Sequence, residues 1–565
     1  MSETKKVLII GASACGAKAA SRIKRLKPEY DVVIIDQGHY ISYAACGMPY
    51  YLSGKVRHFE DLLKTTYGRV RDAEYFKDLK DITVHTGLRA VKIDRAARTV
   101  HGEHLATGET RVYQYDDLVI AAGAAPMNRG IPGAGLTGVY HLTNMEDAAA
   151  IAGAMKEREK GSVVIIGGGF IGVEAAEAFG ERRWDVTIIE KEGQLFPGLL
   201  DFEIAAMIQE HLYEHTVETV LGAGDISIEG EGGRAASVRA GGKQYAADIV
   251  IIAAGIVPEV KIAADAGLAV GTTGALAVDS RLRTNDPAIY AGGDIVENLH
   301  LVTGEQCYIP LGSTANKHGR VIADNICGIH SEFPGVQGTF VCKAFAYSVG
   351  STGITESGAK KRGLDAYAFA VAGFDKAHYY PDSQIMALKV VAENGTGRLL
   401  GLQAVGRGDV ARRVDIAATA LRLRAAMKDL VHLDMAYAPP FSSALDVFVT
   451  AVNVAGNIKT GMMRPVSGVE TRKLLDNDES VIVLDVRMEH EFRRAHIDSP
   501  KVINIPLDQL HARHGELPKG KKILCACLLG LRGFTAQRIL DSLGYPDVRT
   551  VEGGMFLWPW KDDFA

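Results

Sequence analysis

The segment Lys5-Lys-Val-Leu-Ile-Ile-Gly11-Ala-Ser-Ala-Cys-Gly16 decides the fold of the first part of the chain. Its apolar residues form a buried strand that leads into a glycine turn. Residues 17–26 follow with a helical pattern, and residues 31–36 form a second apolar strand. A strand, a glycine turn, a helix and a second strand make up the βαβ unit that binds dinucleotides. The pattern therefore predicts a doubly wound α/β domain.

The residues of this turn have separate physical roles. Gly11 permits the tight turn, Ala12 follows it, and Gly16 lets the helix pack closely on the strand. The N-terminus of the helix then faces a pyrophosphate. Asp36 lies 25 residues after Gly11, where its carboxylate can accept hydrogen bonds from a ribose. Ser13 replaces the second glycine of the fingerprint, which weakens this match.

A second and more complete fingerprint occupies residues 162–172, Ser-Val-Val-Ile-Ile-Gly-Gly-Gly-Phe-Ile-Gly. Its three glycines are Gly167, Gly169 and Gly172, and the strand after the next helix ends at Glu190. Two such units in one chain predict two dinucleotide sites. Glu190 favours NADH, because its charge would repel the 2′-phosphate of NADPH. Lys191 follows directly and keeps NADPH possible.

The composition is that of a globular protein with several domains. A chain of 565 residues is too long for one core and predicts about three or four domains. With 68 acidic and 63 basic residues, no charge excess points to nucleic acid. No apolar stretch reaches the roughly 18 residues of a membrane span, and the few scattered cysteines argue against a secreted disulfide framework. We expect a cytoplasmic protein with small-molecule partners and no metal site.

Cys46 lies in Ser42-Tyr-Ala-Ala-Cys46-Gly-Met-Pro-Tyr-Tyr51, shortly after the first βαβ unit. It has no partner cysteine nearby in the sequence. A redox thiol here would have to exchange with a sulfur atom of the substrate, through a mixed disulfide or a persulfide. The alternative is a structural cysteine, because free cysteine is among the most buried residue types.

Three further segments extend the pattern. Residues 115–126, which contain Gly123, and residues 247–258 are buried strands that end at Gly–Pro turns, and residues 284–294 end at Asp294. With the two fingerprints, these segments resemble the pyridine nucleotide-disulfide oxidoreductases over about residues 5–455. The resemblance implies FAD at the first fingerprint, with Gly123 in its site and Asp294 hydrogen-bonded to the ribityl chain. It implies NAD(P)H at the second fingerprint.

The Cys46 segment, including Ser42, resembles the single-cysteine branch of that family, which contains coenzyme A-disulfide reductases, NADH oxidases and NADH peroxidases. Oxidases and peroxidases of this branch usually carry a histidine in the first glycine loop. That loop has no histidine here, which counts against peroxide chemistry. Residues 377–381 and 435–442 match tyrosine segments of coenzyme A-disulfide reductases.

These tyrosine segments have two interpretations. The resemblance implies a homodimer in which Tyr379 and Tyr437 approach the cysteine of the partner subunit and donate protons to the leaving thiolate. For Tyr437, which begins a Tyr-Ala-Pro-Pro sequence, the alternative is an anchored turn.

Coenzyme A also needs cations for its phosphates. The first predicted helix offers Lys18, Arg22 and Arg25, whose spacing puts them on one face. A solvated basic face would have the same spacing. The family places its coenzyme A contacts on this helix, with Ser42 near the pantetheine end. Asn316 also falls where the family contacts substrate.

The last hundred residues form a separate module. Residues 481–487, 491–497, 502–507, 523–533 and 551–554 carry a series of signatures that resembles a rhodanese domain. Cys527 begins a six-residue loop that ends at Arg532 and precedes a predicted helix at residues 534–540. Backbone N–H groups and the helix N-terminus would surround the sulfur and stabilise a persulfide.

Cys525 points to the same face of the strand as Cys527. We expect it to be structural, with disulfide formation as the alternative.

The sequence thus predicts an α/β protein with two Rossmann-like nucleotide-binding domains, an α+β dimerisation domain and a C-terminal α/β rhodanese domain. The expected boundaries are 1–115 and 250–325 for the FAD-binding domain, 116–249 for the NAD(P)H-binding domain, 326–455 for the dimerisation domain, 456–466 for a glycine-rich linker and 467–565 for the rhodanese domain.

The predicted function is an FAD-dependent NAD(P)H reductase of coenzyme A persulfide, coenzyme A disulfide and polysulfides. Cys46 would be the redox thiol and Cys527 a sulfur carrier, with coenzyme A as a substrate or a tightly bound thiol. Two alternatives stay open. One is an NADH oxidase or peroxidase in which Cys46 cycles through sulfenic acid. The other is a rhodanese module that regulates the reductase without turnover.

Overall fold

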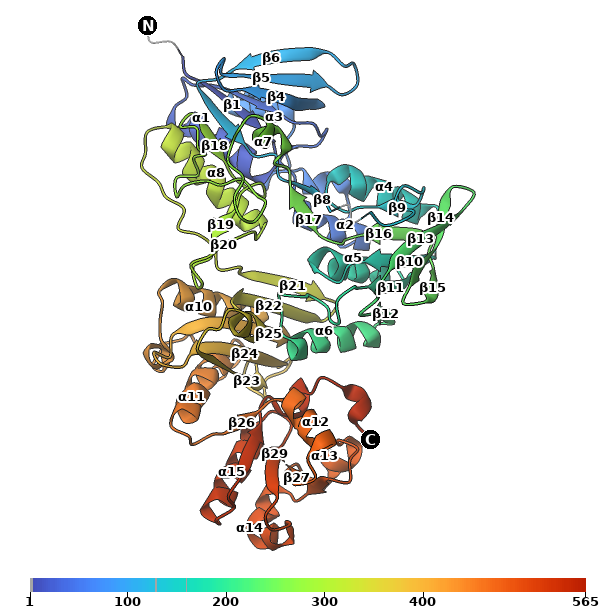
Figure 1. The fold of residues 1–565 in the computed structure, drawn as a ribbon, viewed down its shortest axis with the longest axis vertical. Helices are drawn as coiled ribbons and strands as arrows, with labels where there is room; N and C mark the ends of the chain where they lie inside the picture. The colour runs from blue at the N-terminus through green and yellow to red at the C-terminus, as the bar shows by residue number, and fades with distance from the viewer. Residues whose placement is uncertain (1–3, 128–129, 159) are drawn as a thin grey trace. The chain divides into compact units, whose positions relative to one another are not determined.

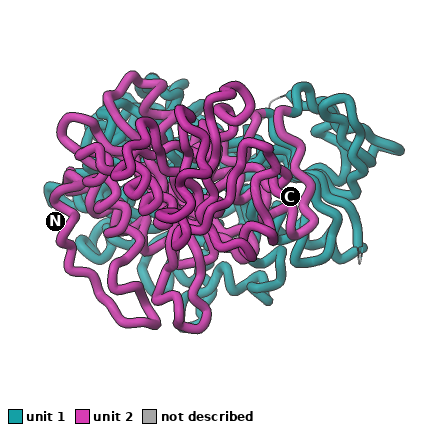
Figure 2. The backbone as a smooth tube through the Cα atoms, turned by 90° about the horizontal axis from the view of Figure 1, so that it is seen from below, with its two compact units in different colours: residues 1–191, 223–336 teal, residues 192–222, 337–565 magenta. Residues whose placement is uncertain are grey.

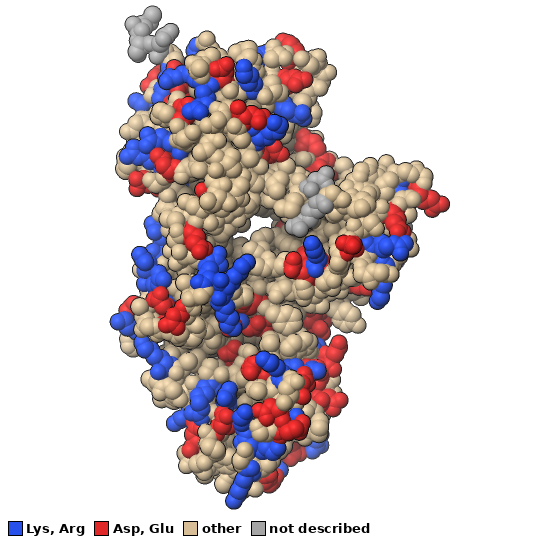
Figure 3. Space-filling model, viewed as in Figure 1, with Lys and Arg blue, Asp and Glu red and all other residues tan. Residues whose placement is uncertain are grey.

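The computed structural model describes residues 4–127, 130–158 and 160–565 (Figure 1). The chain divides into two compact units, residues 1–191 with 223–336 and residues 192–222 with 337–565 (Figure 2). Among the described residues, no helix has both the length and the apolar character that a membrane crossing requires. Acidic and basic side chains are interspersed on the face shown in Figure 3, in keeping with a net charge of −5.

The first unit contains two parallel sheets, each built from a βαβ core. The first sheet has the order β18 (Ile289–Ala291), β7 (Asp117–Ile120), β1 (Lys6–Ile10), β2 (Asp31–Ile35) and β3 (Thr83–His85). Its faces are covered by α1 (Ala14–Leu26), α3 (Ala73–Lys80), α7 (Lys261–Asp265), α8 (Gly312–Ile326) and the antiparallel strands β4 (Leu88–Asp94), β5 (Thr99–His104) and β6 (Thr110–Gln114). The strands are apolar along their length because both faces of a parallel sheet are buried.

The second sheet of this unit contains β11 (Asp185–Ile189), β10 (Ser162–Ile166), β16 (Ile249–Ile252) and β9 (Val139–Tyr140), all parallel. Its helices are α4 (Met145–Lys156) and α5 (Phe170–Glu181), and a three-stranded antiparallel sheet of β13 (Ile226–Glu231), β14 (Arg234–Ala240) and β15 (Lys243–Ala246) follows. The chain passes between the two domains at the antiparallel pair β8 (Ala124–Pro126) and β17 (Ile256–Pro258).

Two predicted domain boundaries therefore need correction. Strand β7 pairs with β1 and belongs to the first sheet, although the boundary at residue 116 assigned it to the second domain. Strand β16 pairs with β10 and belongs to the second sheet, although the boundary at residue 250 assigned most of it to the first domain. The physical reason is that each of these buried strands completes its own parallel sheet before the chain crosses at β8 or β17.

The second unit begins with α6 (Phe202–Glu214) and β12 (Val217–Val220). An antiparallel sheet follows, with the order β21 (Phe340–Ala344), β22 (Tyr347–Gly353), β25 (Leu399–Gly406), β24 (Ile385–Glu393) and β23 (Ala366–Phe374). Helices α9 (Glu356–Lys361), α10 (Val410–Arg422) and α11 (Val447–Lys459) pack on this sheet.

A parallel sheet forms the C-terminal domain, in the order β26 (Pro465–Val466), β30 (Val548–Val551), β29 (Lys522–Ala526), β27 (Val481–Asp485) and β28 (Val502–Asn504). Its helices are α12 (Gly468–Asn477), α13 (Glu489–Arg494), α14 (Leu510–Arg513) and α15 (Leu531–Ser542). The architecture of both units confirms the predicted α/β class. The predicted linker at 456–466 needs correction, because α11 continues to Lys459.

Within the second unit, the C-terminal domain contacts the antiparallel sheet and α6 through the residues after β30. The carboxylate of Glu552 is buried and accepts a backbone hydrogen bond from Ala370 in β23. Trp560 packs against Phe202 with ring centroids 5.7 Å apart. Lys389 in β24 lies beside Glu552 and pairs with Asp201, Glu203 and Glu356. The C-terminal domain is therefore docked through a buried carboxyl group.

Candidate active site

The first glycine turn has the shape that a dinucleotide phosphate requires. Gly11 has a φ of +101°, and a Cβ atom there would lie 2.2 Å from a neighbouring backbone oxygen. A Cβ at Gly16 would lie 1.9 Å from the oxygen of Gly11, so α1 reaches the turn only because Gly16 has no side chain. Asp36, at the end of β2, accepts hydrogen bonds from the N–H groups of Ala12 at 2.6 Å and Gly38 at 2.7 Å.

The second glycine turn has the same construction. Gly167 has a φ of +118°, and a Cβ at Gly172 would lie 1.9 Å from the oxygen of Gly167. Gly169 begins α5, and within the described residues no atom lies within 4 Å of the position its Cβ would take. Glu190 accepts a hydrogen bond from the N–H of Gly168 at 2.7 Å. Each turn thus combines a close-packed helix N-terminus with a carboxylate at the end of the next strand.

Gly123 and Asp294 lie at the ends of strands in the first sheet, close to its glycine turn. Gly123 has a φ of +74° and open space around its Cβ position among the described atoms. Asp294 follows β18, and burial raises the pKa of its carboxyl group. A half-buried carboxyl group beside an open glycine turn is suited to hydrogen-bonding the hydroxyl groups of a ligand. The residues of this sheet fit a dinucleotide held by its phosphates, its ribose and a polyol chain.

Cys46 lies in a turn of 3₁₀-helix, Ala45–Gly47, which runs directly into α2 (Met48–Ser53). It is the only exposed residue among the seven cysteines, all of which are described and free. Burial of its sulfur, followed by the carboxyl groups of Glu174 and Asp294, raises the pKa of the Cys46 thiol. The pKa of Glu174, on α5, is raised to about 7 by its own burial and by Glu177. Residues of both sheets therefore surround the thiol.

Ser42 and Asn316 lie on elements that meet at the first glycine turn. Ser42 has a left-handed backbone, with φ 51°, and its N–H donates to the oxygen of Ala12 at 2.8 Å. A strained residue that is held in this way often belongs to a functional site. Asn316 is exposed on α8, which crosses α1 closely because Gly319 has no Cβ to meet Lys18. The Cys46 segment, α1 and α8 are thus parts of one surface region.

The cationic face of α1 differs from the one predicted. Arg22 is paired with Asp324 of α8 at 2.5 Å, so this arginine ties the two helices together. Lys18 and Arg25 instead face Lys80 of α3 and Arg71. Burial, together with these three cations, lowers the pKa of Lys80 to about 8.

Arg71 and Lys80 are candidate binding residues that the sequence analysis missed. They come from a loop and a helix far from α1 in the sequence, and no motif marks them. In the described part of the chain, no carboxylate lies within ion-pairing distance of Lys18, Arg25, Arg71 or Lys80. Four cations without a paired acid form a suitable site for a phosphate group. We call these four residues the cation cluster.

Tyr379 and Tyr437 line one pocket of the second unit, with a volume of about 240 Å³. Phe374, His378 and Leu445 also line it. The side chains of Tyr379 and Tyr437 are 67% and 52% exposed, so their hydroxyl groups are open to a ligand or to another chain. The structure therefore brings together the two tyrosines that the sequence analysis paired.

The Cys527 loop lies between β29 and α15. The helix begins at Leu531 rather than at residue 534, because Gly530, with a φ of +100°, reverses the chain immediately before it. The N–H of Gly530 donates to the sulfur of Cys527 at 3.1 Å. Arg532 forms a two-point ion pair with Glu491, with N–O distances of 2.7 and 2.8 Å. This ion pair lowers the pKa of Glu491 to about 2.

Cys525 and Cys527 belong to the same buried apolar cluster, as the alternation of the strand predicted. Burial raises the pKa of the Cys525 thiol, which disfavours its ionisation and its reaction as a thiolate. Cys525 therefore has the burial expected of a structural cysteine.

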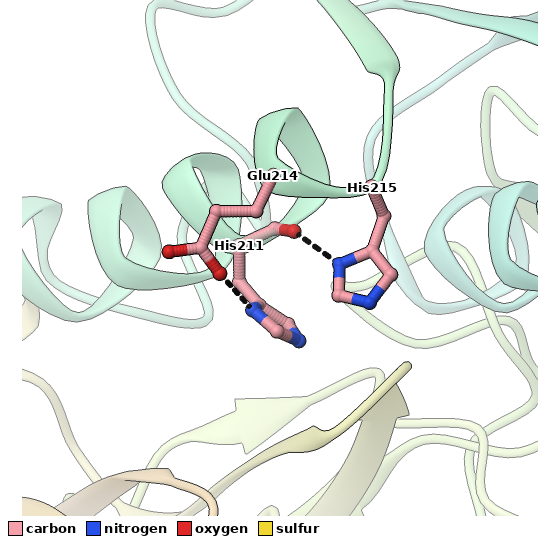
Figure 4. A group of neighbouring side chains, drawn as sticks. All are labelled: His211, Glu214 and His215. Carbon is pink, nitrogen blue, oxygen red and sulfur yellow. Dashed lines mark hydrogen bonds and ion pairs between the residues drawn. The ribbon is translucent and has the colours of Figure 1, made fainter.

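His211, Glu214 and His215, at the end of α6, are close enough to suggest a metal site, with ligand atoms within 4.8 Å of one another (Figure 4). The hydrogen bonds explain this cluster differently. Nε2 of His211 accepts from the N–H of Ala346 at 3.3 Å, so Nδ1 carries the proton and donates to Glu214 at 2.8 Å. A metal on Nδ1 would force an N–H onto Nε2, facing the N–H of Ala346. The two rings stack on Phe345 and Tyr347, so the cluster fastens α6 to the turn between β21 and β22.

Two close-packed glycine turns, an exposed cysteine between their sheets and a Cys–Arg loop in a separate domain define an oxidoreductase with two dinucleotide-binding folds and a sulfurtransferase-type module. Comparison with protein families agrees. The model of the pyridine nucleotide-disulphide oxidoreductases matches residues 5–319, the model of their dimerisation domain matches residues 339–448, and the rhodanese-like domain matches residues 468–559. The chain belongs to the pyridine nucleotide-disulphide oxidoreductase family and carries a C-terminal rhodanese domain. This family implies FAD and NAD(P)H as cofactors.

Several characterised proteins are similar over most of the chain. A CoA-dependent NAD(P)H sulfur oxidoreductase of Pyrococcus furiosus is 37% identical, over 80% of this chain and 99% of that protein. A solved NAD-dependent persulfide reductase from A. fulgidus has a TM-score of 0.93 and 41% identity, over 98% of this chain and all of that one. Bacillus anthracis CoADR-RHD has a TM-score of 0.91 and 34% identity, over 100% and 99% of the two chains. An NADH oxidase of Methanocaldococcus jannaschii is 30% identical, over 77% and 95%.

Proposed function

We propose that this protein is an NAD(P)H-dependent reductase of coenzyme A persulfide, coenzyme A disulfide and polysulfides, in which Cys46 is the redox thiol and Cys527 carries sulfane sulfur. The observation that carries the proposal is Cys46 itself, the exposed cysteine beside the first glycine turn. The relatives named for CoA-dependent sulfur reduction and for persulfide reduction support this choice of substrate.

The first sheet holds the groups that would bind FAD, and bound FAD would supply the transfer of two electrons from NAD(P)H to sulfur. Gly11, Ala12 and Gly16 bring the N-terminus of α1 to the pyrophosphate, and Asp36 accepts from the ribose. Gly167, Gly169, Gly172 and Glu190 do the same for NAD(P)H. In this proposal Gly123 and Asp294 hold the remainder of the flavin nucleotide.

Cys46 would act by nucleophilic attack on the substrate sulfur, after Glu174 takes up the proton that burial holds on its thiol. Its thiolate displaces hydrosulfide from coenzyme A persulfide, or coenzyme A thiolate from the disulfide, and forms a mixed disulfide. Two electrons and a proton then release the coenzyme A thiol and restore the Cys46 thiolate. Glu174, with a pKa raised to about 7, is suited to exchange the proton, because a group that titrates near the working pH can both take up and donate a proton.

The substrate would lie along α1. The cation cluster binds its phosphates, Ser42 lies near the pantetheine end, and Asn316 also contacts the substrate. Arg22 contributes by holding α1 and α8 together. Tyr379 and Tyr437, together on one exposed pocket, complete the site of the partner subunit in a homodimer and protonate the leaving thiolate. The match of residues 339–448 to a dimerisation domain supports this arrangement.

Anaerobic NADH oxidation, measured separately with coenzyme A persulfide, coenzyme A disulfide, polysulfide and peroxide, tests the proposal. We expect turnover with the sulfur substrates and little with peroxide. The similarity to an NADH oxidase supports a second candidate, in which Cys46 forms a sulfenic acid. Turnover that required oxygen or peroxide and ignored coenzyme A substrates would select that candidate instead.

A further inference from the structure

We infer that the Cys527 site selects donors whose sulfane sulfur is attached to an uncharged, largely apolar group, and that it discriminates against the small dianion thiosulfate. The inference rests on the proposed role of Cys527 as a sulfur carrier and names the class of donor that this carrier accepts. Leu528, Leu529 and Leu531 are the residues that would set this preference.

The rim of the site is apolar. Three of the four residues between Cys527 and Arg532 are leucine, and the fourth is Gly530. Leu531 is 76% exposed at the first turn of α15, so its side chain is presented to a ligand and not to the core. Leu528 and Leu529, which directly follow Cys527, are half-buried. A single exposed leucine is ordinary on a protein surface, but three leucines in one nucleophile loop give it an apolar rim, which we call the collar.

The charges at the site are already paired. Arg532 is the only cationic residue of the loop, and both of its terminal nitrogens are bonded to Glu491. Glu491 is held in turn by the N–H of Met488 at 3.0 Å. The nearby buried Arg487 is paired with Asp485 in the same way, at 2.6 Å. Arg532 and Arg487 are therefore each paired with a carboxylate before any anion arrives.

This environment suits the single negative charge on the sulfur of Cys527. It does not suit a donor that brings two more negative charges. The N–H of Gly530 and the N-terminus of α15 stabilise the thiolate or the persulfide of Cys527. A dianion that entered the collar would lose hydration and would meet only Arg532, whose charge is already shared between Glu491 and the sulfur of Cys527. An alkyl or aryl group would instead bury apolar surface against the leucines.

The transfer needs no added oxidant. With an organic thiosulfonate, the Cys527 thiolate attacks the outer sulfur of R–SO₂–S⁻. A bond forms between the two sulfurs, the bond between the outer sulfur and the sulfonyl sulfur breaks, and its electron pair leaves with the sulfinate. The products are Cys527–S–S⁻ and R–SO₂⁻, with two negative charges on each side. Thiosulfate would react in the same way and release sulfite.

Three donors distinguish the effect of donor charge from the effect of apolar contact. The assay transfers sulfur from each donor to cyanide and measures the thiocyanate formed. Benzenethiosulfonate and methanethiosulfonate are both monoanions and differ in apolar bulk, and thiosulfate is the dianion. In the full-length enzyme we expect kcat/KM for benzenethiosulfonate to exceed that for methanethiosulfonate at least tenfold and that for thiosulfate at least a hundredfold.

Comparing a Leu531 variant with the wild type on the same donor cancels the intrinsic reactivity of that donor. Because Leu531 is exposed, its substitution should not disturb the fold. Leu531→Lys should raise kcat/KM for thiosulfate at least fivefold and lower it for benzenethiosulfonate at least fivefold. Leu531→Gln should lower only the benzenethiosulfonate value. The matched control is Leu543→Lys, an exposed leucine just beyond the other end of α15, which should change neither value by more than twofold.

The outcomes separate this inference from the proposed function. Equal use of thiosulfate and benzenethiosulfonate by the wild type, or a donor ratio unchanged in Leu531→Lys, would overturn the inference and leave the carrier role intact. Absence of thiocyanate with all three donors would overturn the carrier role and the inference with it.

Discussion

Glu190 accepts a hydrogen bond from the backbone N–H of Gly168 at 2.7 Å, which places its carboxylate at the second glycine turn. The side chain is 8% exposed, so its charge acts in a partly desolvated setting. A 2′-phosphate bound at this turn would meet a carboxylate, whereas a 2′-hydroxyl would donate a hydrogen bond to it.

We therefore expect NADH to be preferred over NADPH by about 1–3 kcal/mol in kcat/KM. Glu190→Gln should reduce this preference, because it keeps the shape and removes the charge. Asp185→Asn, at the exposed opposite end of β11, is the control and should leave the ratio unchanged. Equal use of both nucleotides by the wild type would show that Lys191 or another cation dominates.

The cation cluster predicts a binding effect restricted to coenzyme A substrates. Lys80→Met should raise KM for coenzyme A persulfide about tenfold or more, because a charge-assisted hydrogen bond to phosphate contributes about 1.5–3 kcal/mol. It should leave kcat and the reduction of inorganic polysulfide unchanged. Lys77→Met, on the same helix but paired with Asp81, is the control. An equal loss with polysulfide would contradict phosphate binding.

The same cluster predicts a pH dependence. Burial and three neighbouring cations lower the pKa of Lys80 to about 8, so its positive charge is lost as the pH rises through that value. KM for coenzyme A persulfide should therefore increase between about pH 7 and pH 9, and this increase should be much smaller in Lys80→Met. A parallel increase in the variant would assign the titration to another group.

Several features of the site could be predicted because they are local. The glycine turns, their carboxylates, Cys46 and the Cys527 loop lie in short motifs whose spacing has a direct physical meaning. The ion pair of Arg22 with Asp324 joins residues 302 positions apart, and no periodicity within α1 distinguishes Arg22 from Lys18. Lys80 joins the cluster only because α3 packs against α1.

The domain boundaries failed for a related reason. The apolar runs that became β7 and β16 look alike, and only the hydrogen-bonded partners decide which sheet each completes. The predicted linker looked flexible because it contains glycine, yet its first residues, 456–459, form the last turn of α11. The burial of Glu552 against β23 likewise depends on how the two domains dock.

Glu552 predicts that docking of the rhodanese domain depends on pH. Burial raises the pKa of its carboxyl group to about 8, above the value of about 4.3 in an unfolded chain. The native state then binds the proton more tightly, so this contribution to stability is complete below about pH 4.3 and is lost as the pH rises to about 8. Glu552→Gln should flatten the decrease of Tm across this window.

We expect Tm of Glu552→Gln at pH 8 to exceed that of the wild type by roughly 4–8 °C, equivalent to about 1 kcal/mol for a domain of about 100 residues. Glu218→Gln, which changes an exposed carboxylate, should follow the wild type at every pH. A variant curve parallel to that of the wild type would mean that Glu552 does not titrate between pH 4.3 and 8.

The pocket of Tyr379 and Tyr437 predicts complementation between subunits. Cys46→Ser and the double variant Tyr379→Phe/Tyr437→Phe should each be inactive or strongly impaired. Co-expressed, they should recover partial activity, because a mixed dimer has one site with an intact cysteine and intact tyrosines. Activity no greater than the sum of the two parents would exclude a site shared between subunits.

The central claim is that every sulfur substrate is reduced through Cys46, and the Cys46→Ser variant tests it most directly. The measurement is the anaerobic reduction of bound FAD by NADH, followed in the same sample by NADH consumption with coenzyme A persulfide and with polysulfide. We predict normal FAD reduction and less than a few per cent of wild-type turnover with either substrate. Substantial polysulfide reduction by this variant would contradict the account.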